Sequence, residues 1–83
     1  MPIIKTTLRG ERIFNRALDL RGRGKYQEGV INHVRACYAC PHCEWYALSL
    51  KYLIDFIGMN RVPKEYRDDV AKILKTLEPH RQS

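Results

Sequence analysis

Residues 37–58 read Cys-Tyr-Ala-Cys-Pro-His-Cys-Glu-Trp-Tyr-Ala-Leu-Ser-Leu-Lys-Tyr-Leu-Ile-Asp-Phe-Ile-Gly, and we expect the rest of the chain to pack around this stretch. It begins with all three cysteines of the protein and continues with its only tryptophan. Glu44, Lys51 and Asp55 share one narrow helical stripe, and apolar residues cover most of the remaining circumference. A helix that is apolar nearly all round is buried on several sides. We therefore predict that residues 41–57 form the central helix.

The segments on either side carry the spacing of amphipathic helices, with apolar residues recurring every three or four positions. Thr6 or Thr7 can cap the first helix at its start, and Gly22 can cap it at its end. Pro41 and Pro63 each suit the first turn of a new helix. The prediction is an all-α single domain (residues 1–83), a small bundle of three to four helices at about 8–20, 26–39, 41–57 and 63–77, with residues 1–7 as an extended arm and residues 79–83 as a frayed tail.

Length and composition limit the classes of protein to which the chain can belong. Eighty-three residues with 45% apolar and 29% charged side chains are typical of one globular domain with a small core. Charged residues interrupt the longest apolar run, so we expect no membrane span. The N-terminus lacks the apolar segment of a signal peptide, and an odd number of cysteines argues against a secreted disulfide framework. These features favour a cytoplasmic protein.

The cysteines suggest a metal site. Cys37, Cys40 and Cys43 are spaced three apart, and His33 lies one helical turn before the first of them. Structural zinc takes four tetrahedral ligands, usually cysteine and histidine. Cys37, Cys40, Cys43 and His33 would supply that set, and His42 could substitute for His33. A structural zinc ion is therefore the cofactor that this segment would bind, as a staple between two helices of a small core.

Two other interpretations of the same residues remain open. The tetrapeptide Cys40-Pro-His-Cys43 resembles the active site of the periplasmic disulfide-oxidase branch of the thioredoxin-like family. That resemblance implies thiol–disulfide chemistry, with a reactive thiolate at a helix N-terminus. Such a fold also requires β-strands on both sides of the motif, and the sequence predicts none. Alternatively, the cysteines are small apolar residues that pack in the core.

The net charge of +6 is concentrated in the first third of the chain, which contains seven basic residues and only two acidic ones. A nucleic-acid contact would use the basic stripe and the glycine-containing loop that follows it. The candidate residues are Arg9, Arg12, Arg16, Arg21, Arg23 and Lys25. A helix-turn-helix centred on Gly58 is not expected, because its two buried positions would fall on Lys64 and Arg67.

The sequence contains no phosphate-binding loop, no catalytic triad and no paired carboxylates, which favours a protein that is not an enzyme. The helix at 41–57 carries more apolar surface than short neighbours can cover, which suggests a homodimer seam or a docking site. Trp45, Tyr46 and Tyr52 are the expected anchors for a partner. Our first hypothesis is a small regulatory protein that binds a larger protein, similar in type to phage or mobile-element antirepressors and host-factor inhibitors. The alternatives are a nucleic-acid-binding regulator and a thiol–disulfide protein.

Overall fold

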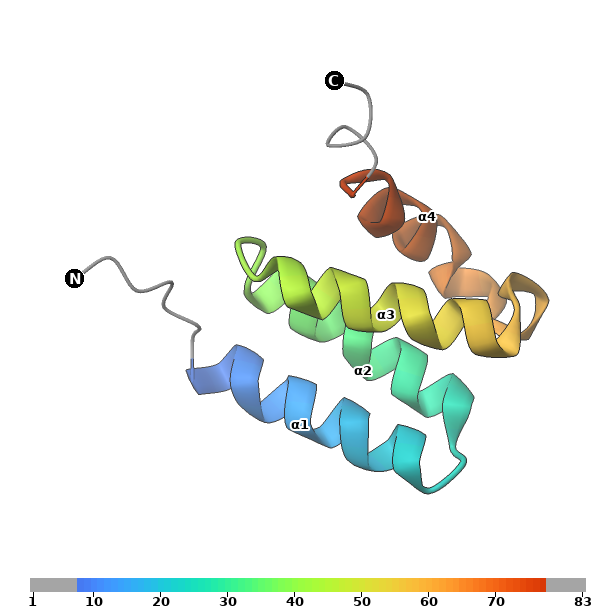
Figure 1. Ribbon diagram of the computed structural model, residues 1–83, viewed down its shortest axis with the longest axis horizontal. Helices are drawn as coiled ribbons and strands as arrows, with labels where there is room; N and C mark the ends of the chain where they lie inside the picture. The colour runs from blue at the N-terminus through green and yellow to red at the C-terminus, as the bar shows by residue number, and fades with distance from the viewer. Residues whose placement is uncertain (1–7, 78–83) are drawn as a thin grey trace.

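The computed structural model describes residues 8–77, and all regular secondary structure in this part of the chain is helical (Figure 1). It contains no strand, so the predicted all-α class is confirmed. The elements, in order, are α1 (Leu8–Gly22), α2 (Tyr26–Ala39), α3 (Glu44–Ile57), two 3-10 turns η1 (Met59–Arg61) and η2 (Lys64–Tyr66), and α4 (Arg67–Lys75). The predicted arm at 1–7, the caps Thr6 and Thr7, and the tail at 79–83 lie outside the described residues.

The helices form two layers. α1 and α3 lie in front of α2 in the view of Figure 1, and α4 runs back above α3, so that its C-terminal end lies near the start of α3. Short connections make α1, α2 and α3 run up, down and up, as expected for neighbouring helices joined by tight loops. α2 packs against all three other α-helices. None of the helices in residues 8–77 is both long and apolar enough to cross a membrane.

The glycine that terminates α1 lies two positions later than predicted. Gly22 is still helical, and Gly24 takes the left-handed conformation with φ of +81°. The Lys25 N–H donates to the Leu20 carbonyl at 2.9 Å, and the Gly24 N–H donates to the Arg21 carbonyl at 3.1 Å. This pair of bonds is a Schellman motif, in which the left-handed residue is normally glycine because glycine has no Cβ. Gly24, and not Gly22, therefore terminates α1.

The turn between α2 and α3 shifts the start of α3 from the predicted residue 41 to Glu44. Cys40 is extended, with φ of −138° and ψ of 81°, as the residue before a proline prefers. The Cys43 N–H donates to the Cys40 carbonyl at 3.1 Å, and a disulfide joins the two side chains. Pro41 therefore stands in the turn and outside the first turn of α3.

The predicted helix at 63–77 is also shorter than expected. Pro63 is extended (φ −53°, ψ 136°), the 3-10 turn η2 follows it, and regular α4 spans only Arg67–Lys75. The Arg67 side chain donates to the backbone carbonyls of Val62 and Asn60 at 3.1 and 3.0 Å. These bonds hold the connection in a tight bend, so the chain cannot enter α4 directly from Pro63.

One core is shared by α2, α3 and α4, with Phe14 and Ile13 of α1 packed against it. The largest fully buried apolar side chains include Leu50 and Leu53 of α3 and Val30 and Val34 of α2. The helix that packs against all the others is α2, so the prediction that the helix at 41–57 is the central one is corrected: α3 supplies much of the core but is not enclosed all round. One flank of α3 remains exposed, and the apolar side chains on that flank form the candidate site.

Candidate functional site

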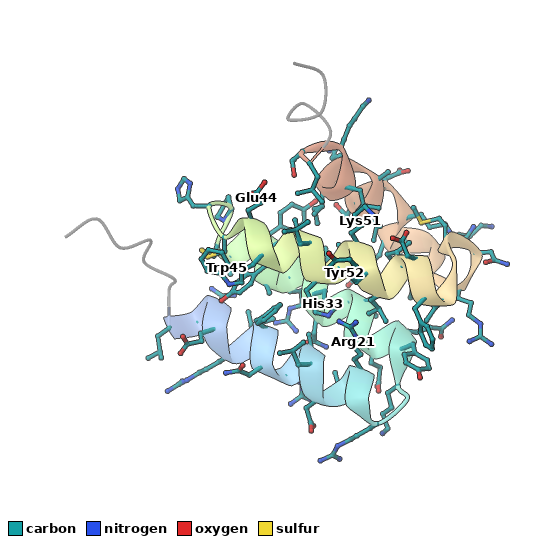
Figure 2. All side chains as sticks on the ribbon, viewed as in Figure 1. Arg21, His33, Glu44, Trp45, Lys51 and Tyr52 are labelled. Carbon is teal, nitrogen blue, oxygen red and sulfur yellow. A yellow bond between two sulfur atoms is a disulfide. The ribbon has the colours of Figure 1, made fainter. Side chains whose placement is uncertain are left out.

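Four large apolar side chains are exposed in a row along α3. Trp45, Leu48, Tyr52 and Phe56 retain 40%, 38%, 61% and 71% of their accessible surface. Their steps of three, four and four residues place them on one side of a helix, adjacent to the face that is buried in the core. In Figure 2 the labelled Trp45 and Tyr52 lie along α3. We call these four residues the docking stripe.

The Trp45 end of the docking stripe is supported by the core. The Trp45 ring meets the edge of Tyr46, with centroids 5.7 Å apart and planes at 79°. Tyr46 stacks in turn on Phe14 of α1, with centroids 4.2 Å apart and planes at 16°. Tyr46 is itself only 1% exposed, and burial raises the pKa of its hydroxyl. The prediction that Tyr46 is a partner anchor is therefore corrected, because this residue fills the space between α1 and α3.

Neighbouring side chains also hold the other end of the docking stripe. The Phe56 ring packs edge-on against Tyr26 of α2, with centroids 5.6 Å apart. Lys51 lies 6.0 Å from the Tyr52 ring centroid and forms an ion pair with Asp55 at 3.0 Å. Aromatic rings that are already positioned lose little conformational entropy on binding, which suits them to be anchors. Trp45 and Tyr52 remain candidate anchors, and Leu48 and Phe56 extend the set.

Figure 2 labels Arg21 of α1 and His33 of α2 in the space that it shows between α1 and α3. Arg21 is half-buried and donates to the Ser49 hydroxyl at 3.2 Å, which joins α1 to α3. His33 is 0% exposed and lies against Phe14, with ring centroids 5.5 Å apart. Burial, reinforced by the positive charge of Arg21, lowers the pKa of His33 to about 4. His33 is therefore neutral at physiological pH and out of reach of any ligand on the surface.

The remaining predicted basic residues differ in their freedom to bind an anion. Arg9, Arg12 and Arg16 are exposed on α1, and Lys25 is exposed at the start of α2. Arg23 is paired with Asp19 at 3.1 Å. Arg21 is engaged with Ser49 on the side of the molecule that faces α3. The predicted basic stripe is thus divided, and only part of it faces solvent without a partner.

The three cysteines line one cavity of about 310 Å³ at the junction of α2, α3 and α4. Cys40 and Cys43 form a disulfide, which leaves Cys37 as the one thiol. Burial raises the pKa of Cys37 to about 12, so this thiol is protonated and a poor nucleophile. All three side chains are buried members of the core, which agrees with the packing interpretation.

The predicted zinc ligands are not assembled. No group of three or more His, Cys, Asp or Glu side chains within residues 8–77 is placed to hold a metal ion. Two of the three sulfurs are joined to each other, His33 packs against Phe14, and His42 is exposed in the turn. The thiol–disulfide interpretation also loses its structural context, because the described residues lack the strands that surround this tetrapeptide in the thioredoxin-like fold.

Comparisons of the chain with protein-family models, with curated proteins and with solved structures gave no significant match. The function must therefore be argued from the surface of this chain alone. Leu48 and Phe56 were not among the anchors that the sequence suggested. Their spacing from Trp45 and Tyr52 was visible in the sequence, but the same spacing is also expected for residues that face a core.

Proposed function

We propose that the protein is a small, non-enzymatic regulatory protein that binds a larger protein partner through the docking stripe. The observation that carries this proposal is the row of one leucine and three aromatic side chains left exposed on a helix whose other face is the core. Contiguous exposed apolar patches on soluble proteins mark interaction sites. Tryptophan and tyrosine are also the residue types that most often dominate binding energy at protein interfaces.

The exposed area agrees in size with such a site. An aromatic side chain buries about 150–250 Å², so the exposed fractions of the docking stripe amount to roughly 400 Å². At about 25 cal/mol per Å², covering this area contributes on the order of 10 kcal/mol. Association costs about 4–15 kcal/mol in lost freedom, so the stripe by itself supports only weak binding. A stable complex therefore also needs contacts around the stripe, which a larger partner can supply.

The chemistry of the described residues supports a role without catalysis. The groups with strongly shifted pKa values are separated or engaged: His33 and Cys37 are buried, and Tyr38 donates a hydrogen bond to Asp69 at 2.5 Å. That bond is the main cause that raises the pKa of Tyr38 to about 12. The one free thiol, Cys37, has its pKa raised by burial and is therefore protonated at neutral pH, so it is not a ready nucleophile. Antirepressors and host-factor inhibitors, which act by blocking another protein, are the type of regulator that we propose.

The experiment compares the partner captured by the wild-type protein with that captured by a variant of the docking stripe. Tyr52→Ser combined with Phe56→Ser removes the two most exposed rings, and the core contacts of α3 remain. Tyr38→Ser is the matched control, because Tyr38 is an exposed tyrosine on α2 outside the stripe. Circular dichroism verifies that each variant is folded before it is used as bait in extracts of the source organism.

We expect one protein to be enriched by the wild type and by the Tyr38 control, and to be lost with the stripe variant. Binding of the purified partner, measured by calorimetry, should weaken by roughly 5- to 30-fold per ring removed, since each anchor contributes on the order of 1–2 kcal/mol. Equal capture by the wild type and the stripe variant would contradict the proposal. Light scattering on both proteins reveals a homodimer, in which a second copy covers the same stripe.

A further inference from the structure

A second surface, separate from the docking stripe, carries unpaired positive charge. Arg9, Arg12 and Arg16 are exposed on α1, and Arg35 is exposed on α2. The only salt bridges among residues 8–77 are those of Arg23 with Asp19 and of Lys51 with Asp55, so these four arginines have no acidic partner there. We call Arg9, Arg12, Arg16 and Arg35 the arginine face.

The structure shows that the four arginines belong to one surface. Arg9 and Arg35 line the same hollow between α1 and α2, together with Ile13, Tyr38 and Ala39. Arg16 lines a second hollow between the same two helices, where Arg23 and Lys25 add positive charge and Asp19 and Glu28 add negative charge. The steps of three and four residues from Arg9 to Arg12 to Arg16 keep these side chains on one strip of α1. The hollows follow the junction of α1 and α2, whereas the docking stripe lies on α3.

The arginine set found here differs from the set that the sequence suggested. Arg21 is excluded because its guanidinium bonds Ser49 of α3. Arg23 is excluded because it already forms an ion pair with Asp19 at 3.1 Å. Arg35 is added, because packing brings it beside Arg9 although 26 positions separate them in the sequence. This difference makes it possible to test the surface residue by residue.

The dimensions of the arginine face match a phosphate backbone. Arg9 and Arg16 are seven residues apart, which corresponds to about 10.5 Å along the helix. One strand of duplex nucleic acid carries a phosphate about every 3.4 Å of axis, so this length spans about three phosphates. Arg35 lies on the neighbouring helix, which adds a fourth cation at a helix spacing of about 8–10 Å. Guanidinium groups bind phosphate through two hydrogen bonds, and their charge is permanent.

We propose that the arginine face binds the phosphate backbone of duplex nucleic acid without regard to base sequence. The surface is formed by two adjacent helices, and its one exposed ring, Tyr38, is tied to Asp69 by a hydrogen bond. Single-stranded nucleic acid is bound on several rings that stack successive bases, so four arginines with one ring favour a duplex backbone over unpaired bases. The protein could thereby bind its protein partner through the docking stripe while the arginine face rests on nucleic acid. This second activity does not depend on the proposed protein partner.

The test measures the affinity for short random-sequence duplexes of DNA and of RNA by fluorescence anisotropy, between about 50 and 200 mM salt. Four phosphate contacts predict a slope of log Kobs against log salt of about −3.6, or a loss of affinity of roughly 100-fold over this range. Arg35→Ala should make the slope shallower by about 0.9, and Arg23→Ala should leave it unchanged. Comparison of the affinities for the two duplexes shows whether the arginine face prefers DNA or RNA.

A matched control distinguishes binding by the arginine face from a general effect of the net charge of the protein. Arg16→Ala with Arg35→Ala removes two charges from the arginine face, and Lys72→Ala with Lys75→Ala removes two exposed charges from α4. The first double variant should lose about half of the salt slope, whereas the second should keep it. Equal weakening by both double variants would overturn the proposal, as would absence of binding at 50 mM salt. Binding to anionic phospholipid vesicles but not to either duplex would also overturn it.

Discussion

Replacing His33 by leucine is expected to stabilise the protein and to flatten the dependence of its stability on pH. His33 is fully buried, and neither of its ring nitrogens has a hydrogen-bond partner among residues 8–77. A buried polar group without a partner costs about 1–3 kcal/mol. Leucine has no polar atoms to desolvate and can occupy much of the same volume against Phe14. At neutral pH the variant should therefore gain up to about 2 kcal/mol of unfolding free energy.

The pH effect follows from the pKa of His33. Burial first, and then the charge of Arg21, lower this pKa from 6.5 to about 4 in the folded protein. Between pH 4 and 6.5 the unfolded chain therefore binds a proton that the folded protein does not, so stability falls as pH falls. One pKa unit corresponds to about 1.36 kcal/mol, so the full loss below pH 4 is about 3 kcal/mol. Of this, about 2 kcal/mol is lost between about pH 7.5 and 5.

Urea unfolding at about pH 7.5 and 5, followed by circular dichroism, measures this loss. The wild type and a His42→Gln control should lose the same amount, because His42 is exposed in the turn between α2 and α3. His33→Leu should lose about 2 kcal/mol less than either. His33→Gln is a second variant that removes the titration and keeps a polar group. It should show the same flattened pH dependence without the gain at neutral pH.

Two results would refute this account. The first is an NMR titration of the wild-type protein in which the His33 imidazole is protonated near pH 6.5. The second is a His33→Leu or His33→Gln variant that loses as much stability on acidification as the wild type. Either result would mean that the core around Phe14 admits water or supplies a partner for the imidazolium.

Three further predictions concern the disulfide-closed turn and two glycines. Reduction of the Cys40–Cys43 disulfide should lower the unfolding free energy by about 2 kcal/mol, as expected for a four-residue loop, and a Cys40→Ser, Cys43→Ser variant should unfold at the same urea concentration as the reduced protein. Gly58→Ala should cost about 1–3 kcal/mol in thermal or urea unfolding, because Gly58 has φ of +91°; a cost near zero would contradict the backbone assignment. Gly29→Ala should gain up to about 1 kcal/mol, since its Cβ would lie an ordinary 3.6 Å from the α1 backbone, whereas Gly29→Leu should be destabilising.

The sequence predicted the helices more accurately than their ends. The limits of α2 are as predicted, because the Arg-Gly-Arg-Gly loop and Pro41 bound a clear apolar period. α3 begins three residues late, since the disulfide and the extended residue before Pro41 form a turn there. The helix after Pro63 begins late because Arg67 bonds the backbone of the preceding bend. Helix propensity and apolar period do not predict these side-chain contacts, so they could not fix the helix ends.

The candidate surfaces were only partly visible in the sequence. Composition and period together indicated that α3 has more apolar surface than its neighbours can cover, and they named Trp45 and Tyr52. They could not separate Tyr46, which is buried, from Trp45 beside it, which is exposed. One residue corresponds to a rotation of about 100° on a helix, and only the position of α1 determines which of the two directions is covered.

The sequence by itself determined that the chain is all-α, where its four helices lie approximately, and that its positive charge is concentrated in the first third. These properties depend on local period, on glycine and proline, and on composition. Only the tertiary structure decided that His33 is buried without a partner, that Arg21 is withdrawn towards α3, and that Arg35 joins Arg9. The physical reason is that burial and pairing depend on which helix faces meet, and the local sequence of one helix does not specify which helices will pack against it. The stretch from Cys37 to Gly58 is thus a core helix with a disulfide-closed turn before it and an exposed apolar flank.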